Sequence, residues 1–249
     1  MKIKNFKIKK AVLAISFSCL VAGCNNYNGK EIVVNKEPVE QNNDIENIDL
    51  NTEYLDKKIK LDELIYIENM YTKTNLNLRE SNSTDSNIII VIEKCQKLME
   101  IENLGDWSYI KYGDKLGYVK NCYINDLPDS YIEVDISDQN IKYHTNEEII
   151  LDSNIVTGMQ NVSDTRIGMF EIYSKQTSRY LTGPGYRSYV DYWMPFDGGI
   201  GLHDASWRDE FGGEIYINSG SHGCVNLPFE IAKKIYDNSE IGTKVLVHK

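Results

Sequence analysis

Cysteine and histidine are scarce in this sequence of 249 residues, which contains five cysteines and four histidines. No C-x-x-C or H-x-x-x-H pair occurs, and zinc sites commonly begin with such pairs. We therefore expect no metal site and no cofactor. The small number of histidines also restricts the choice of any general base.

Long apolar runs are missing as well. The run "AVLAISFSCLVAG" has 13 residues, too few to span a bilayer comfortably. It follows "MKIKNFKIKK", with five lysines and no acid, which is typical of a secretory signal. Its end, "LVAGC", resembles the lipobox of bacterial lipoproteins. We expect a lipoprotein signal peptide over residues 1–23 and lipidation of Cys24, with an ordinary secretory signal or an uncleaved anchor as the alternative.

Basic residues are in the minority, with 27 Lys and Arg against 37 Asp and Glu. Loss of the signal removes five lysines and changes the formal net charge from −10 to −15. Phosphate binding needs a clustered basic face, so nucleic acid is not an expected partner. The body of the protein is expected outside the cytoplasm, anchored by lipid to the outer face of the cell membrane.

Three cysteines remain in that body, Cys95, Cys122 and Cys224, so at least one thiol cannot pair within the chain. A disulfide between Cys95 and Cys122 is compatible with an exported protein, and the sequence leaves this open. Residues 24–66, rich in Asn, Asp, Glu and Lys, are expected to form a flexible stalk.

Residues 67–127 contain short alternating segments broken by turn residues, which predicts a small all-β domain. The pieces "LNLRES", "GDWSYIKY" and "KLGYVKNCYI" resemble a bacterial SH3-type domain. That resemblance implies cell-wall binding or targeting, and Cys95 stands where the family usually has glycine. Trp107, Tyr109 and Tyr118 are interpreted either as a ligand surface or as filling for a small core.

Residues 130–249 begin with a sequence pattern that predicts a β-hairpin. Ile132, Val134 and Ile136 alternate with polar residues, as in a sheet with one buried face. No alternation of helices and strands follows, which argues against a doubly wound fold.

The stretch "SGSHGCVNLPFEIAKKIY" places Cys224 ahead of an expected helix. Asn226 is a candidate helix cap and Pro228 suits the first turn. A helix N-terminus close to a thiol favours the thiolate, so Cys224 is a candidate nucleophile. The backbone N–H groups of Gly223 and Cys224 are candidate oxyanion donors.

Two histidines are candidate bases for that thiol. His144 and His248 are expected to be ordinary surface residues, one in the first hairpin and one at the C-terminus. His203 lies in "GIGLHDASW", and His222 precedes the cysteine by two residues, which on a strand-like segment places it on the same side. The competing interpretations are a zinc site formed by His203, His222 and Cys224, or a buried structural cysteine.

The segments "VTG", "RIGMF", "GIGLHD", "SHGCVNL" and "GTKVLVH" resemble the L,D-transpeptidase (YkuD-type) catalytic family. The resemblance implies a mainly β fold, a small SH3-like barrel followed by a β-sandwich with a short helix after the cysteine. It implies that Cys224 is the nucleophile, that His203 accepts and donates the proton, and that the Asp204 carbonyl holds the imidazole. Residues that shape the loop would be Ser221, His222 and Asn226, and His222 ranks second as the base.

Two further segments have expected roles near the substrate groove. The family usually has Thr-Pro-Thr-Gly where this chain has "TRIG", a segment expected to serve the sheet and lid more than the chemistry. The insertion "SRYLTGPGYRSYVDYWMPF" is expected to form a lid over the substrate groove. Its candidate walls are Tyr180, Tyr186, Tyr192 and Trp193, with packing onto the sheet as the alternative.

The resemblance implies a peptidoglycan L,D-transpeptidase that acts on stem tetrapeptides, releases D-Ala and forms 3→3 cross-links in cell-wall biogenesis. Carbapenems are expected to acylate Cys224. An L,D-carboxypeptidase or a catalytically silent wall-binding lipoprotein is the alternative. Sortases need an arginine shortly after the cysteine, whereas the last arginine here is Arg208, and papain-like hydrolases place cysteine before histidine.

Overall fold

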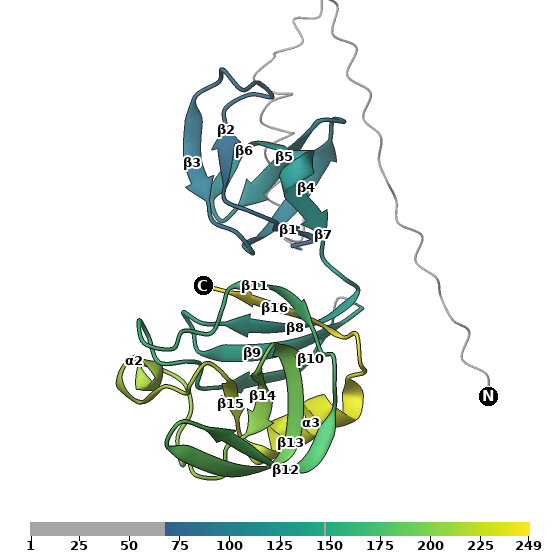
Figure 1. The fold of residues 1–249 in the computed structure, drawn as a ribbon. Helices are drawn as coiled ribbons and strands as arrows, with labels where there is room; N and C mark the ends of the chain where they lie inside the picture. Colours follow the sequence, from purple (N-terminus) through teal and green to yellow (C-terminus); the bar gives the residue numbers. More distant parts are fainter. Residues whose placement is uncertain (1–67, 147) are drawn as a thin grey trace, which may run out of the picture. The chain divides into compact units, whose positions relative to one another are not determined.

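The structure is a computed structural model that describes residues 68–146 and 148–249. The expected signal peptide, the anchor Cys24 and the stalk lie outside the described residues. Within the described part of the chain, no helix has both the length and the apolar character to cross a membrane. The fold is mainly β, as the sequence predicted, and its strands fall into two groups that we describe separately (Figure 1).

The N-terminal group is one sheet with the strand order β3-β2-β6-β5-β4-β1-β7. Alternating residues such as Leu78, Ile110 and Val119 are fully buried in its core. Its elements are β1 (Met70–Thr72), β2 (Leu76–Arg79), β3 (Ile88–Ile92), β4 (Lys97–Asn103), β5 (Trp107–Tyr112), β6 (Lys115–Lys120), the 3-10 helix η1 (Asn121–Tyr123) and β7 (Ile124–Asp126).

Trp107, Tyr109 and Tyr118 do not belong to the core, which consists of Leu, Ile, Val and Met side chains with Ile90 and Tyr112 packed against it. In β5, Ser108 and Ile110 are buried, so the alternating neighbours Trp107 and Tyr109 lie on the other face. Tyr109 and Tyr118 pair there with ring centroids 5.0 Å apart. The core-filling interpretation is therefore wrong, and the rings form a half-buried aromatic surface.

Cys95 adopts a left-handed backbone conformation with φ of 62°. Glycine reaches this region without a steric penalty, whereas another residue costs about 1–2 kcal/mol there. This explains why glycine usually stands at the position in SH3-type domains. Cys95 and Cys122 are both free thiols, so the open disulfide question is answered in the negative for this structure.

The C-terminal group consists of two sheets, with strand orders β10-β9-β8-β16-β11 and β12-β13-β14-β15. Two short helices accompany them (Figure 1). The elements are β8 (Ser130–Asp135), β9 (Asn140–Thr145), β10 (Glu148–Asn154), β11 (Gly168–Glu171), β12 (Gln176–Gly183), β13 (Tyr186–Asp197), β14 (Ile200–Asp204), α2 (Ile215–Ser219), β15 (Val225–Leu227), α3 (Phe229–Asn238) and β16 (Lys244–His248).

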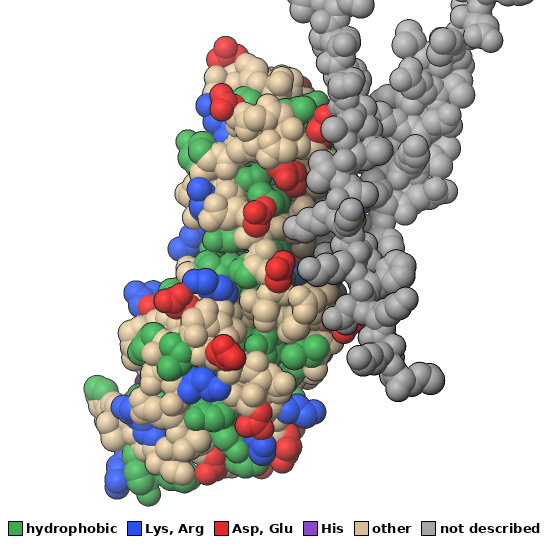
Figure 2. Space-filling view, turned by 90° about the vertical axis from the view of Figure 1, so that its right-hand side faces the viewer, with side chains coloured by type: hydrophobic (Ala, Val, Ile, Leu, Met, Phe, Trp, Pro, Cys, Tyr) green, Lys and Arg blue, Asp and Glu red, His purple; other side chains and the backbone are tan. Residues whose placement is uncertain are grey.

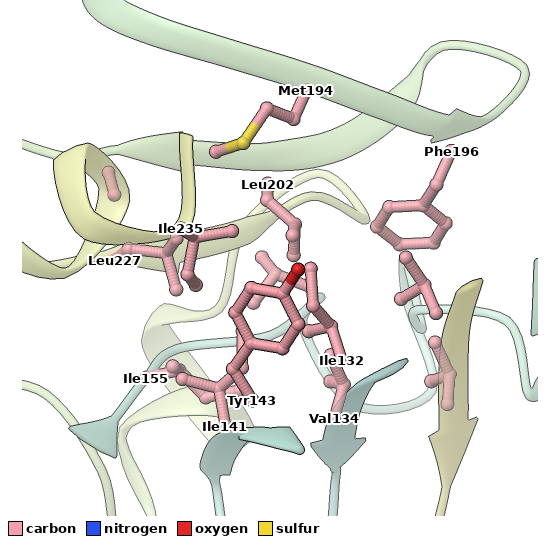
Figure 3. Close-up of a cluster of buried hydrophobic side chains, with 14 of the residues drawn as sticks. Ile132, Val134, Ile141, Tyr143, Ile155, Met194, Phe196, Leu202, Leu227 and Ile235 are labelled. Atoms are coloured by element: carbon pink, nitrogen blue, oxygen red, sulfur yellow. The ribbon is translucent and has the colours of Figure 1, made fainter. Parts of the chain in front are cut away.

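The core of this domain lies between the two sheets (Figure 3). Ile132 and Tyr143 project from one sheet toward Leu202 and Met194 of the other, and α3 adds Ile235. Full burial of one such side chain contributes about 1.5–3 kcal/mol. The core therefore fixes the two sheets against each other and sets the positions of β14 and β15.

The helix after the cysteine is present, but its start differs from the expectation. Pro228, not Asn226, is the N-cap, and Asn226 lies in β15. Glu230 is in the first turn, and Ala232 and Ile235 are buried. A three-residue strand therefore separates Cys224 from the helix.

Charge on the described part of the face seen in Figure 2 is mixed in sign. Figure 2 shows Lys and Arg side chains interspersed with Asp and Glu over the face in view, with no basic stripe gathered on it. That face lacks the clustered positive charge that phosphate binding requires.

His144 and His248 are not ordinary surface residues. His144 Nε2 lies 2.6 Å from Glu133 Oε2, and His248 Nε2 lies 2.8 Å from Glu133 Oε1. Glu133 and His248 are both buried, and they lie on the adjacent parallel strands β8 and β16. Burial acts to raise the pKa of Glu133, but hydrogen bonds with His144 and His248, together with the charge and hydrogen bond of Lys97 at 2.9 Å, more than offset it and lower that pKa. Burial opposes charging of His248, yet Glu133 raises its pKa overall.

The Glu133 cluster predicts a dependence of stability on pH. The lowered pKa of Glu133 adds stability above its unfolded value of 4.5, which is lost on acidification. The raised pKa of His248 adds stability below its unfolded value of 6.5, which is lost as the pH rises through the folded value. We expect Glu133→Gln to cost about 3 kcal/mol near pH 5.5 and clearly less near pH 8.5, measured by urea unfolding. Equal losses at the two pH values would contradict this.

Candidate active site

The parallel pairing of β14 with β15 brings the candidate base and nucleophile together. His203 is opposite Asn226, and Leu202 is opposite Val225. Cys224 directly precedes β15, so it comes level with Gly201, whose backbone N–H hydrogen-bonds to the sulfur. His203 in β14 and Cys224 immediately before β15 are 21 positions apart in the sequence, but they thereby lie close together and line one cavity of about 160 Å³.

His203 is held in one orientation. Its Nδ1 donates to the Asp204 carbonyl oxygen at 2.8 Å, which leaves Nε2 as a proton acceptor. The rings of Trp193 and Trp207 lie next to the imidazole, and each ring centroid is 5.8 Å from the centroid of the imidazole ring. Burial lowers the pKa of His203, only partly opposed by the Asp204 carbonyl, and the positive charge of Arg208 lowers it further. The imidazole is therefore neutral at pH 7, as a general base must be.

The Cys224 thiol is neutral at rest. Burial raises its pKa above the usual 9.0, and the Gly201 N–H only partly opposes this. The sulfur lies 3.8 Å from the Gly199 carbonyl oxygen, an acceptor for the thiol proton. The expected help from a helix N-terminus is absent, because β15 and Pro228 intervene before α3. A nucleophilic role for Cys224 would therefore require transfer of the thiol proton to a base.

The loop before Cys224 is a series of bends and not a strand. Gly223 has φ of 112°, a conformation that other residues rarely adopt. The side-chain alternation of a β-strand therefore does not apply to this loop, and it does not place His222 on the same side of the backbone as Cys224. The Gly223 N–H donates to Ser221 Oγ at 3.0 Å, so it is already used. Of the two expected oxyanion donors, only the Cys224 N–H has no bond to another described residue.

His222 faces outward. Its ring is exposed and stacks on Tyr186 with centroids 4.6 Å apart and an interplanar angle of 17°. Both residues line the cavity that contains Cys224. This position suits a wall of the substrate site better than a base.

The segment "TRIG" supports the cysteine loop, a role that the sequence did not reveal. The Thr165 hydroxyl donates to the Gly223 carbonyl at 2.8 Å and accepts from the Gly158 N–H at 2.9 Å. Thr165 is buried. Ser163 adds a second link by donating to the Ser221 carbonyl at 2.7 Å. The expectation that this segment serves mainly the sheet and lid therefore needs correction.

The candidate lid is the hairpin of β12 and β13, and its aromatic residues divide into three groups. Tyr186, near the tip, lines the cavity. Trp193 is buried against His203, and Tyr192 packs on Phe229. Tyr180 is exposed, with the Arg187 guanidinium 3.8 Å from its ring centroid. Only Tyr186 of the four expected lid residues lines the cavity.

Asn226 and Asp204 are both buried. The Asp204 carboxylate accepts from the Tyr192 N–H at 2.7 Å, and Asn226 pairs through its backbone with Val156. Asn226 Oδ1 is buried without a hydrogen-bond partner among the described residues. Over the same residues, no group of three or more His, Cys, Asp and Glu side chains is arranged to hold a metal ion.

Comparison with known proteins assigns both parts of the chain. Residues 129–247 match the L,D-transpeptidase catalytic domain, and residues 74–125 match the bacterial SH3 domain. The NMR structure of the catalytic domain of an Enterococcus faecium L,D-transpeptidase is 38% identical over 49% of this chain and 98% of that chain, with a TM-score of 0.46.

Two further solved structures come from the same enzyme type. The E. faecium catalytic domain acylated by ertapenem is 38% identical over 50% of this chain and 100% of that chain, with a TM-score of 0.46. A crystal structure of E. faecium L,D-transpeptidase with a cysteine-to-serine mutation is 26% identical over 80% of this chain and 82% of that chain, with a TM-score of 0.49. A search of curated proteins found no match.

The Thr165 contacts predict a specific stability effect. We expect Thr165→Val to lower the free energy of unfolding by about 2–4 kcal/mol, because Gly158 N–H and Gly223 C=O both lose their partner. Thr165→Ser keeps the hydroxyl and should cost about 1 kcal/mol for the lost methyl group. Urea unfolding of both variants measures the difference, and equal losses would show that the hydroxyl does not support the loop.

Proposed function

Because the chain belongs to the L,D-transpeptidase family, we propose that it is a peptidoglycan L,D-transpeptidase with Cys224 as nucleophile and His203 as general base. Its substrate would be the stem tetrapeptide, attacked at the carbonyl of the third residue with release of the terminal D-Ala. The observation that carries this proposal is the neutral, oriented imidazole on the strand adjacent to the thiol.

Acylation would proceed by proton transfer and attack in one site. The thiol proton moves to His203 Nε2, and the sulfur forms a bond to the carbonyl carbon. Negative charge then develops on the carbonyl oxygen, for which the Cys224 N–H is the candidate donor. The imidazolium returns its proton to the leaving nitrogen as the C–N bond breaks, which gives a thioester and free D-Ala.

The thioester would then be resolved by an amine of a second stem peptide. The neutral imidazole takes a proton from the attacking amine, and the thiolate leaves and is reprotonated. The product is a 3→3 cross-link, which would contribute to cell-wall biogenesis. If water attacked the thioester in place of the amine, the enzyme would be an L,D-carboxypeptidase.

The SH3-type domain would hold the enzyme on its substrate. Its outer aromatic surface, with Trp107, Tyr109 and Tyr118, suits stacking on wall material. Lipidation of Cys24 would anchor the chain at the outer face of the cell membrane, facing the cell wall. Membrane anchor and wall-binding domain together would raise the local concentration of stem peptides.

Incubation of the protein with disaccharide-tetrapeptide, followed by mass spectrometry, tests the reaction. We expect dimers that lack one D-Ala, and a carbapenem adduct on Cys224. Cys224→Ala is a small change in a cavity wall. It should keep the circular dichroism spectrum of the wild type but form neither the dimers nor the carbapenem adduct. Tripeptide without dimers would indicate a carboxypeptidase, and no product together with binding to wall fragments would indicate a silent binding protein. Turnover by Cys224→Ala would refute the mechanism.

The assignment of the base predicts a pH profile for Cys224 acylation by a carbapenem. The wild-type rate should fall on acidification with a midpoint below 6.5, because burial lowers the pKa of His203. His203→Ala should reduce the rate at pH 7 by about a hundred- to ten-thousandfold. Its rate should then rise about tenfold per pH unit up to the pKa of the thiol, which burial raises above 9.0, and level off beyond that pKa.

His222→Ala is the matched control for this profile. It should keep the shape of the wild-type curve, since His222 stacks on Tyr186 at the wall of the cavity. A profile altered in His222→Ala and not in His203→Ala would exchange the two assignments.

A further inference from the structure

Arg208 lies in the same cavity as Cys224 and has no role in the mechanism above. It follows β14 by four residues, and its half-buried side chain lines the cavity of about 160 Å³ together with Cys224, His203 and Trp207. Its Nη2 donates to the Ser219 carbonyl oxygen at 2.8 Å. The Nε–H is buried and has no acceptor among the described residues.

The charge of Arg208 is not neutralised within the described part of the chain. None of the ion pairs found there includes it, whereas Arg166 pairs with Asp197. Burial lowers the pKa of Arg208, and its positive charge reaches the site, where it lowers the pKa of His203. A partly desolvated, unpaired guanidinium is costly to maintain, so an anionic partner at this position would be strongly favoured.

A second unpartnered polar atom lies in the same cavity wall. Asn226 Oδ1 is buried without a partner among the described residues and accepts hydrogen bonds only. The cavity thus presents an anion-binding donor and a neutral acceptor to one ligand. The carboxylate end of a peptide, with an adjacent amide N–H, offers both complementary groups.

We propose that Arg208 is a specificity-determining residue that binds the C-terminal carboxylate of the acyl donor, on the residue that leaves. This assignment rests on the proposed function, in which the D-Ala after the attacked carbonyl is the leaving residue. One residue spans at most about 3.6 Å, so its carboxylate must lie close to Cys224. The cavity volume of about 160 Å³ equals about five water molecules, which suits one small residue.

The position of Arg208 selects donor length as well as charge. A donor with one further residue would move its carboxylate out of this cavity and bring a neutral amide against the guanidinium. An amidated donor would do the same without any change in length. Donors that end in a carboxylate directly after the leaving residue should therefore be preferred by about ten- to hundredfold.

The competing role for Arg208 is that of a loop brace, through its bond to Ser219. A brace would affect every donor equally, whereas a carboxylate-binding residue affects only donors with the carboxylate. The ratio of the rates with the two donors therefore separates the roles, and the rate with one donor does not.

The experiment uses the full chain and two synthetic donors that differ only at the C-terminus, a tetrapeptide acid and the corresponding tetrapeptide amide. The rate of release of D-Ala or D-Ala amide is measured at about pH 8, where His203 is neutral in all variants. We expect the wild type to prefer the acid, and Arg208→Gln to lose this preference through a slower reaction with the acid alone. Arg208→Lys, which retains the charge, should keep part of it.

Binding to the Cys224→Ala protein gives a second readout without turnover. The acid should bind about ten- to hundredfold more tightly than the amide, and Arg208→Gln in that background should remove the difference. A parallel loss for both donors would establish the brace role and overturn the proposal. If the wild type releases D-Ala from the acid and D-Ala amide from the amide at equal rates, the Arg208 assignment alone is overturned. If it releases neither product, the proposed function is overturned and the Arg208 assignment with it.

Discussion

The parallel pairing of β14 with β15 is the constraint on which the rest of the site depends. It sets Cys224, immediately before β15, level with Gly201 and places His203 opposite Asn226, so the thiol and the imidazole lie close together. Val156 pairs with Asn226 on the other side of β15, and the inter-sheet core packs beneath. Displacement of β15 by one residue would reverse the side chains of the strand and separate the two groups.

Burial determines the protonation states of the site. The same dry surroundings raise the pKa of the thiol and lower that of the imidazole, so both groups are neutral before substrate binds. A permanent thiolate–imidazolium pair is thus not favoured, and in the proposed mechanism the proton would move only as the sulfur attacks. Arg208 adds to this by its positive charge, which lowers the pKa of His203 further. Under the proposal that Arg208 binds the donor carboxylate, substrate charge and base strength would be coupled in this cavity.

Tertiary contacts corrected several interpretations of single residues. Asn226 looked like a helix cap but lies in a strand, and His248 looked like a terminal surface residue but is buried on Glu133. Trp107 looked equally suited to a core or a surface and lies on the outer face. In each case local chemistry was compatible with two environments, and the choice between them was made by strands distant in the sequence.

The sequence by itself determined the mainly β fold, the helix after the cysteine and the short set of candidate residues around Cys224. These follow from local patterns of two to four residues and from a family resemblance in the motif. Only the tertiary structure decided which histidine lies on the strand adjacent to the thiol, that Thr165 supports the loop, and that Arg208 lines the cavity without a counter-charge from the described residues. The physical reason is that strand pairing and burial join residues far apart in the chain, and the pattern around one residue does not specify its partner.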